Sequence, residues 1–126
     1  MKYFLCGFCG NLVELINVGG GELVCCGEPM RELLPKSTDV GNEKHLPVVT
    51  VEGSRVIVKV GSVEHPMTEE HYIDFITIYY NGKMQRAKLN HTGKPEATFV
   101  VAEEFSSIEV YSYCNVHGLW KTEYKK

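Results

Sequence analysis

The sequence predicts an all-β protein in two parts, a small N-terminal module built around a metal and a larger β-sandwich. Four of the five cysteines lie within the first 26 residues. Short β-branched runs separated by turn residues fill the rest of the chain, and no stretch has the periodicity of an amphipathic helix. A length of 126 residues suits one small module and one sandwich-sized domain.

The N-terminal module is predicted to span residues 1–35. Two strand-like segments, residues 12–16 and 22–24, flank a run of three glycines. Below about 40 residues a folded unit usually needs a metal, disulfides or oligomerisation, because it cannot bury enough apolar surface alone. Residues 35–42 are polar and rich in turn formers, and we interpret them as a linker.

The second part, residues 36–126, is predicted to contain about seven short strands. Six of the candidate strands can be placed, at residues 46–51, 55–60, 72–80, 97–102, 108–113 and 119–124. Asn81-Gly82, directly after the third of these, is a strong signal for a two-residue hairpin. Short strands with turns at this spacing favour an immunoglobulin-like β-sandwich.

Composition and charge restrict the classes of function. The formal net charge is −3, so the chain offers no overall positive field, and we expect neither nucleic acid nor an anionic membrane as a partner. No segment approaches the roughly 20 apolar residues of a membrane span. The N-terminus also has no apolar stretch typical of a signal peptide, so the expected compartment is the cytoplasm.

The first candidate site consists of four cysteines. Cys6 and Cys9 form a C-x-x-C pair followed by glycine, a spacing that lets both thiolates reach one metal. Cys25 and Cys26 are adjacent, and neighbouring side chains of an extended strand point to opposite faces. A turn must therefore bring them together if they are to complete a tetrahedral site for iron or zinc. Structural zinc stays the main alternative, and disulfides are disfavoured in a reducing cytosol.

The second candidate site combines histidines with the fifth cysteine. Four of the five histidines lie in turns or at predicted strand ends: His45, His65, His71 and His117. Cys114 and His117 have the two-residue spacing of a metal-binding loop. One such histidine alone is more typical of a surface or core residue, but the set indicates a metal site. His91 lies in a polar turn and matches no ligand motif.

Five donors favour iron over zinc, because zinc sites are almost always four-coordinate. Four imidazoles in a plane with one axial thiolate leave a sixth position open opposite the sulfur, where a small ligand can bind. A thiolate donates electron density to iron and influences dioxygen-type chemistry on the opposite face.

These motifs resemble those of the desulfoferrodoxins, a family of two-iron superoxide reductases. The cysteine pairs, with Gly27-Glu28-Pro29-Met30 after Cys26, are similar to the family's desulforedoxin-type, rubredoxin-like centre. The segments similar to those around its catalytic iron are Glu43-Lys44-His45, His65-Pro66-Met67, His71-Tyr72-Ile73 and Cys114-Asn115-x-His117-Gly118-x-Trp120. The resemblance runs in order over nearly the whole chain.

The resemblance implies an oxidoreductase that reduces superoxide to hydrogen peroxide and releases no dioxygen. Two iron ions are the implied cofactors, one held by four cysteines. The implied ligands of the other are His45, His65, His71 and His117 in the equatorial plane and Cys114 on the axis. Glu43 would occupy the sixth position of the oxidised iron and leave on reduction. Lys44 would attract the superoxide anion and assist its protonation through water.

The family also suggests partners, namely an electron donor such as rubredoxin and a second copy of the chain in a homodimer. Three other functions stay open from the residues alone. A zinc-stabilised structural or binding protein would be colourless, and an electron carrier would use only the N-terminal iron. A superoxide dismutase would release dioxygen.

Overall fold

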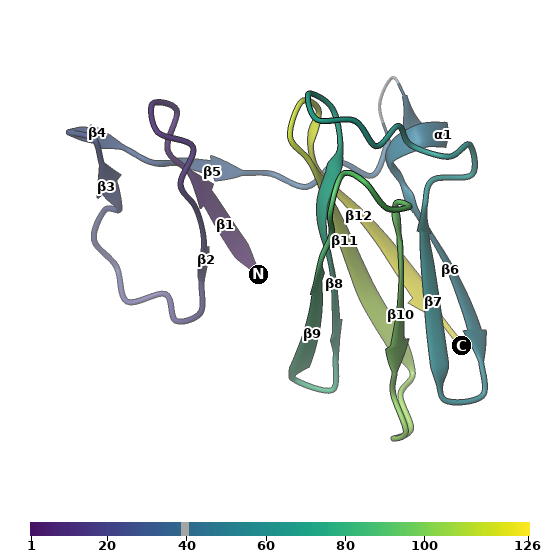
Figure 1. Ribbon diagram of the computed structural model, residues 1–126. Helices are drawn as coiled ribbons and strands as arrows, with labels where there is room; N and C mark the ends of the chain where they lie inside the picture. The colour runs from purple at the N-terminus through teal and green to yellow at the C-terminus, as the bar shows by residue number, and fades with distance from the viewer. Residues whose placement is uncertain (39–40) are drawn as a thin grey trace. The chain divides into compact units, whose positions relative to one another are not determined.

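The regular structure of the chain is almost entirely β, which confirms the predicted fold class. A computed structural model describes residues 1–38 and 41–126, and the chain forms two compact units, Met1–Leu34 and Pro35–Lys126 (Figure 1). Asp39 and Val40, which belong to the predicted linker, lie outside the described residues.

The smaller unit contains a three-stranded antiparallel sheet and a short hairpin. The sheet has the order β2 (Leu12–Leu15), β1 (Lys2–Leu5) and β5 (Arg31–Leu33). The hairpin joins β3 (Val24–Cys25) to β4 (Glu28–Pro29). The strand expected at residues 12–16 forms β2, which pairs with β1, whereas the strand expected at residues 22–24 overlaps β3 only at Val24, and β3 pairs with β4. The strand β1 is not predicted, because four residues at a chain end carry too little pattern.

The larger unit is a β-sandwich in which neighbouring strands pair antiparallel. One sheet has the order β10 (Glu96–Val100), β7 (Arg55–Val60) and β6 (Pro47–Glu52). The other has the order β12 (Gly118–Lys125), β11 (Ser107–Cys114), β8 (Ile73–Tyr80) and β9 (Lys83–Lys88). The hairpin predicted at Asn81-Gly82 joins β8 to β9, and both of its turn residues have positive φ, as a two-residue turn of this kind requires.

The core of the larger unit is formed by apolar side chains from both sheets. Val56 and Val58 of β7 are fully buried, and so are Ile76 and Ile78 of β8 and Val110 of β11. Alternate residues of β7 are buried, as expected for a strand with one face on the core. Each buried side chain of this size contributes about 1.5–3 kcal/mol, so these strands form a firm support for the loops at their ends.

One end of the larger unit gathers the segments that carry the candidate histidines. The short helix α1 (Asn42–His45), the loop between β7 and β8 and the turn between β11 and β12 all lie there, opposite the β6–β7 and β8–β9 turns (Figure 1). No helix is predicted from the sequence, because four residues are too few for helical periodicity to be visible. Among the described residues, no helix is long and apolar enough to cross a membrane.

Candidate metal centres

The four N-terminal cysteines come together in one cluster. Their Sγ atoms all lie within 4.8 Å of one another, and Cys9 Sγ is 3.5 Å from Cys25 Sγ. Four sulfurs bound at about 2.3 Å to one tetrahedral ion would lie about 3.8 Å apart. The cluster therefore has the dimensions of a four-thiolate metal site.

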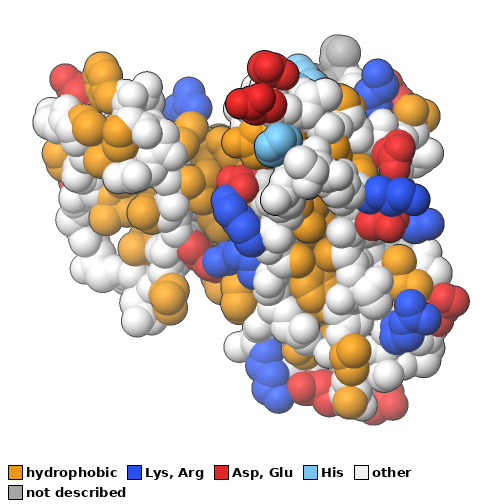
Figure 2. All heavy atoms as spheres, viewed as in Figure 1, with side chains coloured by type: hydrophobic (Ala, Val, Ile, Leu, Met, Phe, Trp, Pro, Cys, Tyr) orange, Lys and Arg blue, Asp and Glu red, His pale blue; other side chains and the backbone are white. Residues whose placement is uncertain are grey.

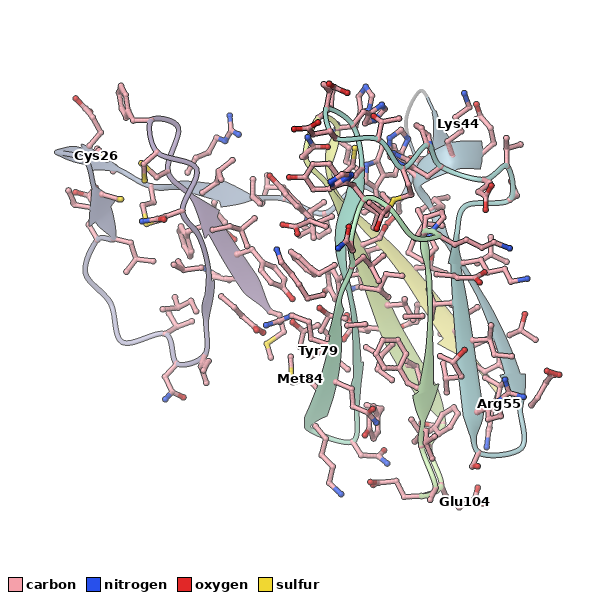
Figure 3. All side chains as sticks on the ribbon, viewed as in Figure 1. Cys26, Lys44, Arg55, Tyr79, Met84 and Glu104 are labelled. Carbon is pink, nitrogen blue, oxygen red and sulfur yellow. The ribbon has the colours of Figure 1, made fainter. Side chains whose placement is uncertain are left out.

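A left-handed backbone at Cys26 brings the adjacent cysteines into the same cluster. Cys26 has a φ of 55° and Gly27 a φ of 76°, and these two residues form the turn between β3 and β4 (Figure 3). Hairpin turns with positive φ at both central residues take the chain sharply out of the extended conformation. The Cys26 thiol consequently does not point to the face opposite Cys25, as it would in a continuous strand.

Local hydrogen bonds give these thiols different pKa values. The N–H groups of Cys9 and Phe8 point at Cys6 Sγ and lower the pKa of that thiol to about 6. Hydrogen bonding with Cys9, and then with Cys6 and Cys25, raises the pKa of Cys26 to about 12. Four thiolates cannot form side by side unless a cation compensates their charge, so the cluster needs a bound metal to be fully ionised.

Four imidazoles face one another at the end of the larger unit. Adjacent ring centroids are 4.7 Å apart for His45–His65, His65–His71 and His45–His117, and 5.0 Å apart for His71–His117. His45 and His71 lie 6.4 Å apart, which exceeds the sides in nearly the ratio of a square's diagonal to its side. The four rings therefore stand at the corners of a square, with His45 opposite His71.

The ring nitrogens show that the square has the size of a metal site. His45 Nε2 lies 3.0 Å from His117 Nδ1. Two donors at right angles, each about 2.1 Å from a shared ion, would be about 3.0 Å apart. The Nε2 atoms of His65 and His71 are buried without a hydrogen-bond partner. Leaving a buried polar atom unsatisfied costs about 1–3 kcal/mol, and a metal ion among these nitrogens would remove that cost.

Backbone carbonyls fix the orientation of two of the histidines. His45 Nδ1 donates to the Gly41 carbonyl at 2.8 Å, and His65 Nδ1 donates to the Pro66 carbonyl at 2.7 Å. These bonds place the proton on Nδ1 and leave Nε2 with a free lone pair. Burial lowers the pKa of His45, and it lowers that of His65 to about 4, so burial favours the neutral, metal-binding form of both rings.

Cys114 provides a fifth donor beside the square. Its Sγ lies within 4.8 Å of the ligating nitrogens of His45, His65 and His71, and 3.8 Å from His117 Nδ1. The side chain is fully buried at the end of β11, and the His117 N–H donates to its sulfur at 3.3 Å. Burial raises the pKa of the thiol, so ionisation of Cys114 also depends on a neighbouring cation.

Glu43 and Lys44 lie on α1 directly before His45, and both side chains are exposed. Burial lowers the pKa of His71, and the charge of Lys44 contributes to that decrease, which places Lys44 within electrostatic reach of the site. Figure 3 shows Lys44 at the α1 end of the larger unit, far from Arg55. Among the described residues, the donor group around His45 does not include the Glu43 carboxylate.

Trp120 supports the site in a way that the sequence analysis did not identify. Its ring stacks on His45 with the centroids 4.8 Å apart, and its Nε1 donates to the His117 carbonyl at 3.2 Å. In the sequence, Trp120 stands out only as the last residue of the motif that begins at Cys114, and that motif does not show that its ring packs on His45. His91 is exposed and lies outside both donor groups.

A four-thiolate cluster on a small β module and a four-imidazole, one-thiolate cluster on a β-sandwich define a class of non-haem protein with two metal centres. The family model described as desulfoferrodoxin matches residues 37–123, and that of the desulfoferrodoxin N-terminal domain matches residues 1–33. The chain belongs to the desulfoferrodoxin family, which confirms the relationship inferred from its motifs.

Three individual proteins that are similar to this chain support the family assignment. A desulfoferrodoxin homolog of Archaeoglobus fulgidus is 46% identical over 122 residues, which cover 97% of this chain and 96% of the relative. A superoxide reductase of Thermococcus kodakarensis is 34% identical over 107 residues, covering 70% of this chain and 91% of the relative. The crystal structure of the superoxide reductase from Treponema pallidum has a TM-score of 0.79 and 35% identity, covering 96% of this chain and 95% of that one. Family and donor groups are together consistent with two iron sites.

Proposed function

We propose that the chain is a superoxide reductase whose reaction takes place at the four-histidine group. The observation that carries the proposal is the square of imidazoles with one buried thiolate beside it, since five donors leave one position of an iron ion for a small ligand. Similarity to the superoxide reductases of Treponema pallidum and Thermococcus kodakarensis supports it. When bound, the iron supplies the one electron that, with two protons, converts superoxide to hydrogen peroxide.

Each residue of the site has a separate task in this proposal. His45, His65, His71, His117 and Cys114 would hold the second iron, with the four imidazoles around it and the thiolate beside them. The buried thiolate donates electron density towards the position where superoxide binds. Glu43, exposed on α1, would offer its carboxylate to that position when the iron is oxidised and would withdraw it when the iron is reduced. Lys44 attracts the anionic substrate and assists its protonation through water.

In this proposal, each of the two parts of the chain holds one of the two irons. Residues 1–35 form the domain of the first iron, held by Cys6, Cys9, Cys25 and Cys26, and residues 36–126 form the catalytic domain. All five ligands assigned to the second iron lie in the larger unit, which supports this division. The further partners in this proposal are a small iron protein such as rubredoxin as electron donor and a second copy of the chain. The proposed compartment is the cytoplasm.

The proposed activity is tested by product stoichiometry on the reduced, iron-loaded protein. We expect each superoxide added under anaerobic conditions to yield one hydrogen peroxide and no dioxygen. Release of dioxygen would identify a dismutase. Optical spectra before and after oxidation test the metals, and we expect two separable sets of thiolate-to-ferric-iron bands. Bands from the four-cysteine centre alone would favour an electron carrier, and a colourless, fully metallated protein would favour structural zinc.

We expect Lys44→Ala to slow the encounter with superoxide and to weaken its dependence on salt. The net charge of −3 repels the anion, and Glu69 and Glu70, just before His71, are exposed. Acidic side chains are visible beside histidines at this end of the larger unit (Figure 2). Loss of one local positive charge should reduce the rate at low ionic strength by about three- to tenfold. The difference should shrink as salt shortens the Debye length from about 30 Å to about 10 Å.

Rapid-mixing kinetics across a range of ionic strength measure this effect. The matched control is Lys125→Ala, which removes the same charge at the end of β12 remote from the site. Equal rates for Lys44→Ala and the unmodified protein at every ionic strength would exclude the proposed role of Lys44.

A further inference from the structure

We propose that Gly61 is a positioning residue. Because Gly61 has no side chain, the Glu43–Lys44 segment can pack against its backbone and stay in its working place beside the metal site. This inference rests on the proposed function, in which Glu43 and Lys44 act at the sixth position of the iron. Gly61 itself does not belong to either donor group among the described residues.

The backbone at Gly61 packs directly against the peptide that joins Glu43 to Lys44. A Cβ atom on Gly61 would lie 2.6 Å from the Glu43 carbonyl oxygen and 2.9 Å from the Lys44 carbonyl carbon. Real Cβ atoms essentially never approach another heavy atom to under 3.0 Å. Both neighbouring atoms belong to the main chain, so no flexible side chain can move aside. Any residue larger than glycine must displace this segment.

Glycine is needed at position 61 because there is no space for a Cβ atom, and not because the backbone has a positive φ. Gly61 is not among the glycines with positive φ, whereas Gly53 and Gly82 are, and those two are explained by the hairpin turns in which they lie. Gly93 also lacks a positive φ, but a Cβ there would come no closer than 3.5 Å to the Asn90 carbonyl oxygen. An alanine therefore fits at Gly93 and collides with the main chain at Gly61.

Two hydrogen bonds from the same loop hold the Glu43 carbonyl. The Val63 N–H donates to it at 2.7 Å, and Ser62 Oγ donates at 3.2 Å. Two residues further on, the His65 N–H donates to the Val60 carbonyl at 3.0 Å. The same loop therefore holds the Glu43 carbonyl by hydrogen bonds and also carries His65, a proposed iron ligand.

The helix α1 cannot hold Glu43 and Lys44 in place by itself. The helix α1 has only four residues, and one turn of helix is unstable without support from the rest of the fold. The position of the Glu43 and Lys44 side chains relative to His65 therefore depends on the contact at Gly61 and on the two hydrogen bonds beside it. In Gly61→Ala, the segment moves away while all five donors are retained.

The test compares the full-length, iron-loaded protein with Gly61→Ala, Gly93→Ala, Glu43→Ala and the double variant Gly61→Ala/Glu43→Ala. Iron content and the optical band of the oxidised second iron are measured for each. We expect Gly61→Ala to retain both irons and to shift this band in the same direction as Glu43→Ala. The double variant should show no further shift, because the two changes act through one group. The rate with superoxide should fall about tenfold or more, while Gly93→Ala should behave like the unmodified protein.

Two outcomes separate failure of the inference from failure of the proposed function. If Glu43→Ala shifts the band and Gly61→Ala does not, Gly61 has no positioning role and the inference is wrong. If Glu43→Ala leaves the band unchanged as well, the assignment of Glu43 to the iron is wrong. If Gly61→Ala loses its iron, Ser62→Ala provides the test, because it removes one hydrogen bond from the Glu43 carbonyl without adding an atom. We then expect a smaller shift in the same direction, and an unchanged band would overturn the inference.

Discussion

Replacement of Cys114 by serine is expected to abolish superoxide reduction and to leave the four-cysteine centre intact. Cys114 is the buried thiol beside the imidazole square, and a serine hydroxyl in its place does not ionise near neutral pH. An iron held only by the imidazoles would lack the axial electron donor. The rate should fall by more than the roughly 10- to 100-fold that follows loss of a residue that merely supports a ligand.

The measurement is the optical spectrum of oxidised Cys114→Ser together with its rate with superoxide. The thiolate-to-iron bands of the second iron should disappear, while those of the four-cysteine centre persist and act as an internal control within the same molecule. A rate within a few fold of the unmodified protein would show that the thiolate is dispensable and would contradict the proposed mechanism.

Replacement of Cys9 by serine is expected to unfold the smaller unit and to spare the reaction. This unit has little core, because several of its large apolar side chains are exposed, including Phe8 at 73%, Ile16 at 79% and Leu34 at 74%. A structural metal in a module of this size contributes about 10–16 kcal/mol when the ligands are cysteine and histidine, as zinc-finger peptides show. Loss of one thiolate therefore removes most of what stabilises Met1–Leu34.

Hydrogen exchange read peptide by peptide measures this effect. Protection should fall in Met1–Leu34 and persist in Pro35–Lys126, and the rate with superoxide should change little. Cys9→Ser and Cys114→Ser form a reciprocal pair, since each is expected to disable one metal centre and leave the other intact. Retained protection in the smaller unit after loss of its iron would show that this unit folds without a metal. A large fall in rate would show that the two units act together in catalysis.

Much of the fold was predictable because its strands carry local signals. The runs in β7, β8 and β11 are β-branched or aromatic, and Asn81-Gly82 specifies a hairpin. The pairing of β1 with β5 in the smaller unit was not predictable, because β2, β3 and β4 lie between these two strands in the sequence. The helix α1 was missed because one turn leaves no periodic pattern.

The donor residues were recognisable because cysteine and histidine are the residue types whose chemistry binds metals, and their order and spacing can be read directly from the chain. The geometry of these donor residues could not be read from the sequence. The need for a turn at the adjacent cysteines could be inferred, but the left-handed conformation of Cys26 that provides it depends on how β3 and β4 pair.

The sequence by itself determined which residues offer donors of the kind that bind metals, the class of fold that carries them and the family to which the chain belongs. Only the tertiary structure decided that His117 presents Nδ1 to its neighbour His45, whereas His45 and His65 present Nε2. It also decided which backbone lies against Glu43. The physical reason is that these features depend on carbonyl groups and close contacts supplied by other segments, which no local pattern around a histidine or a glycine records.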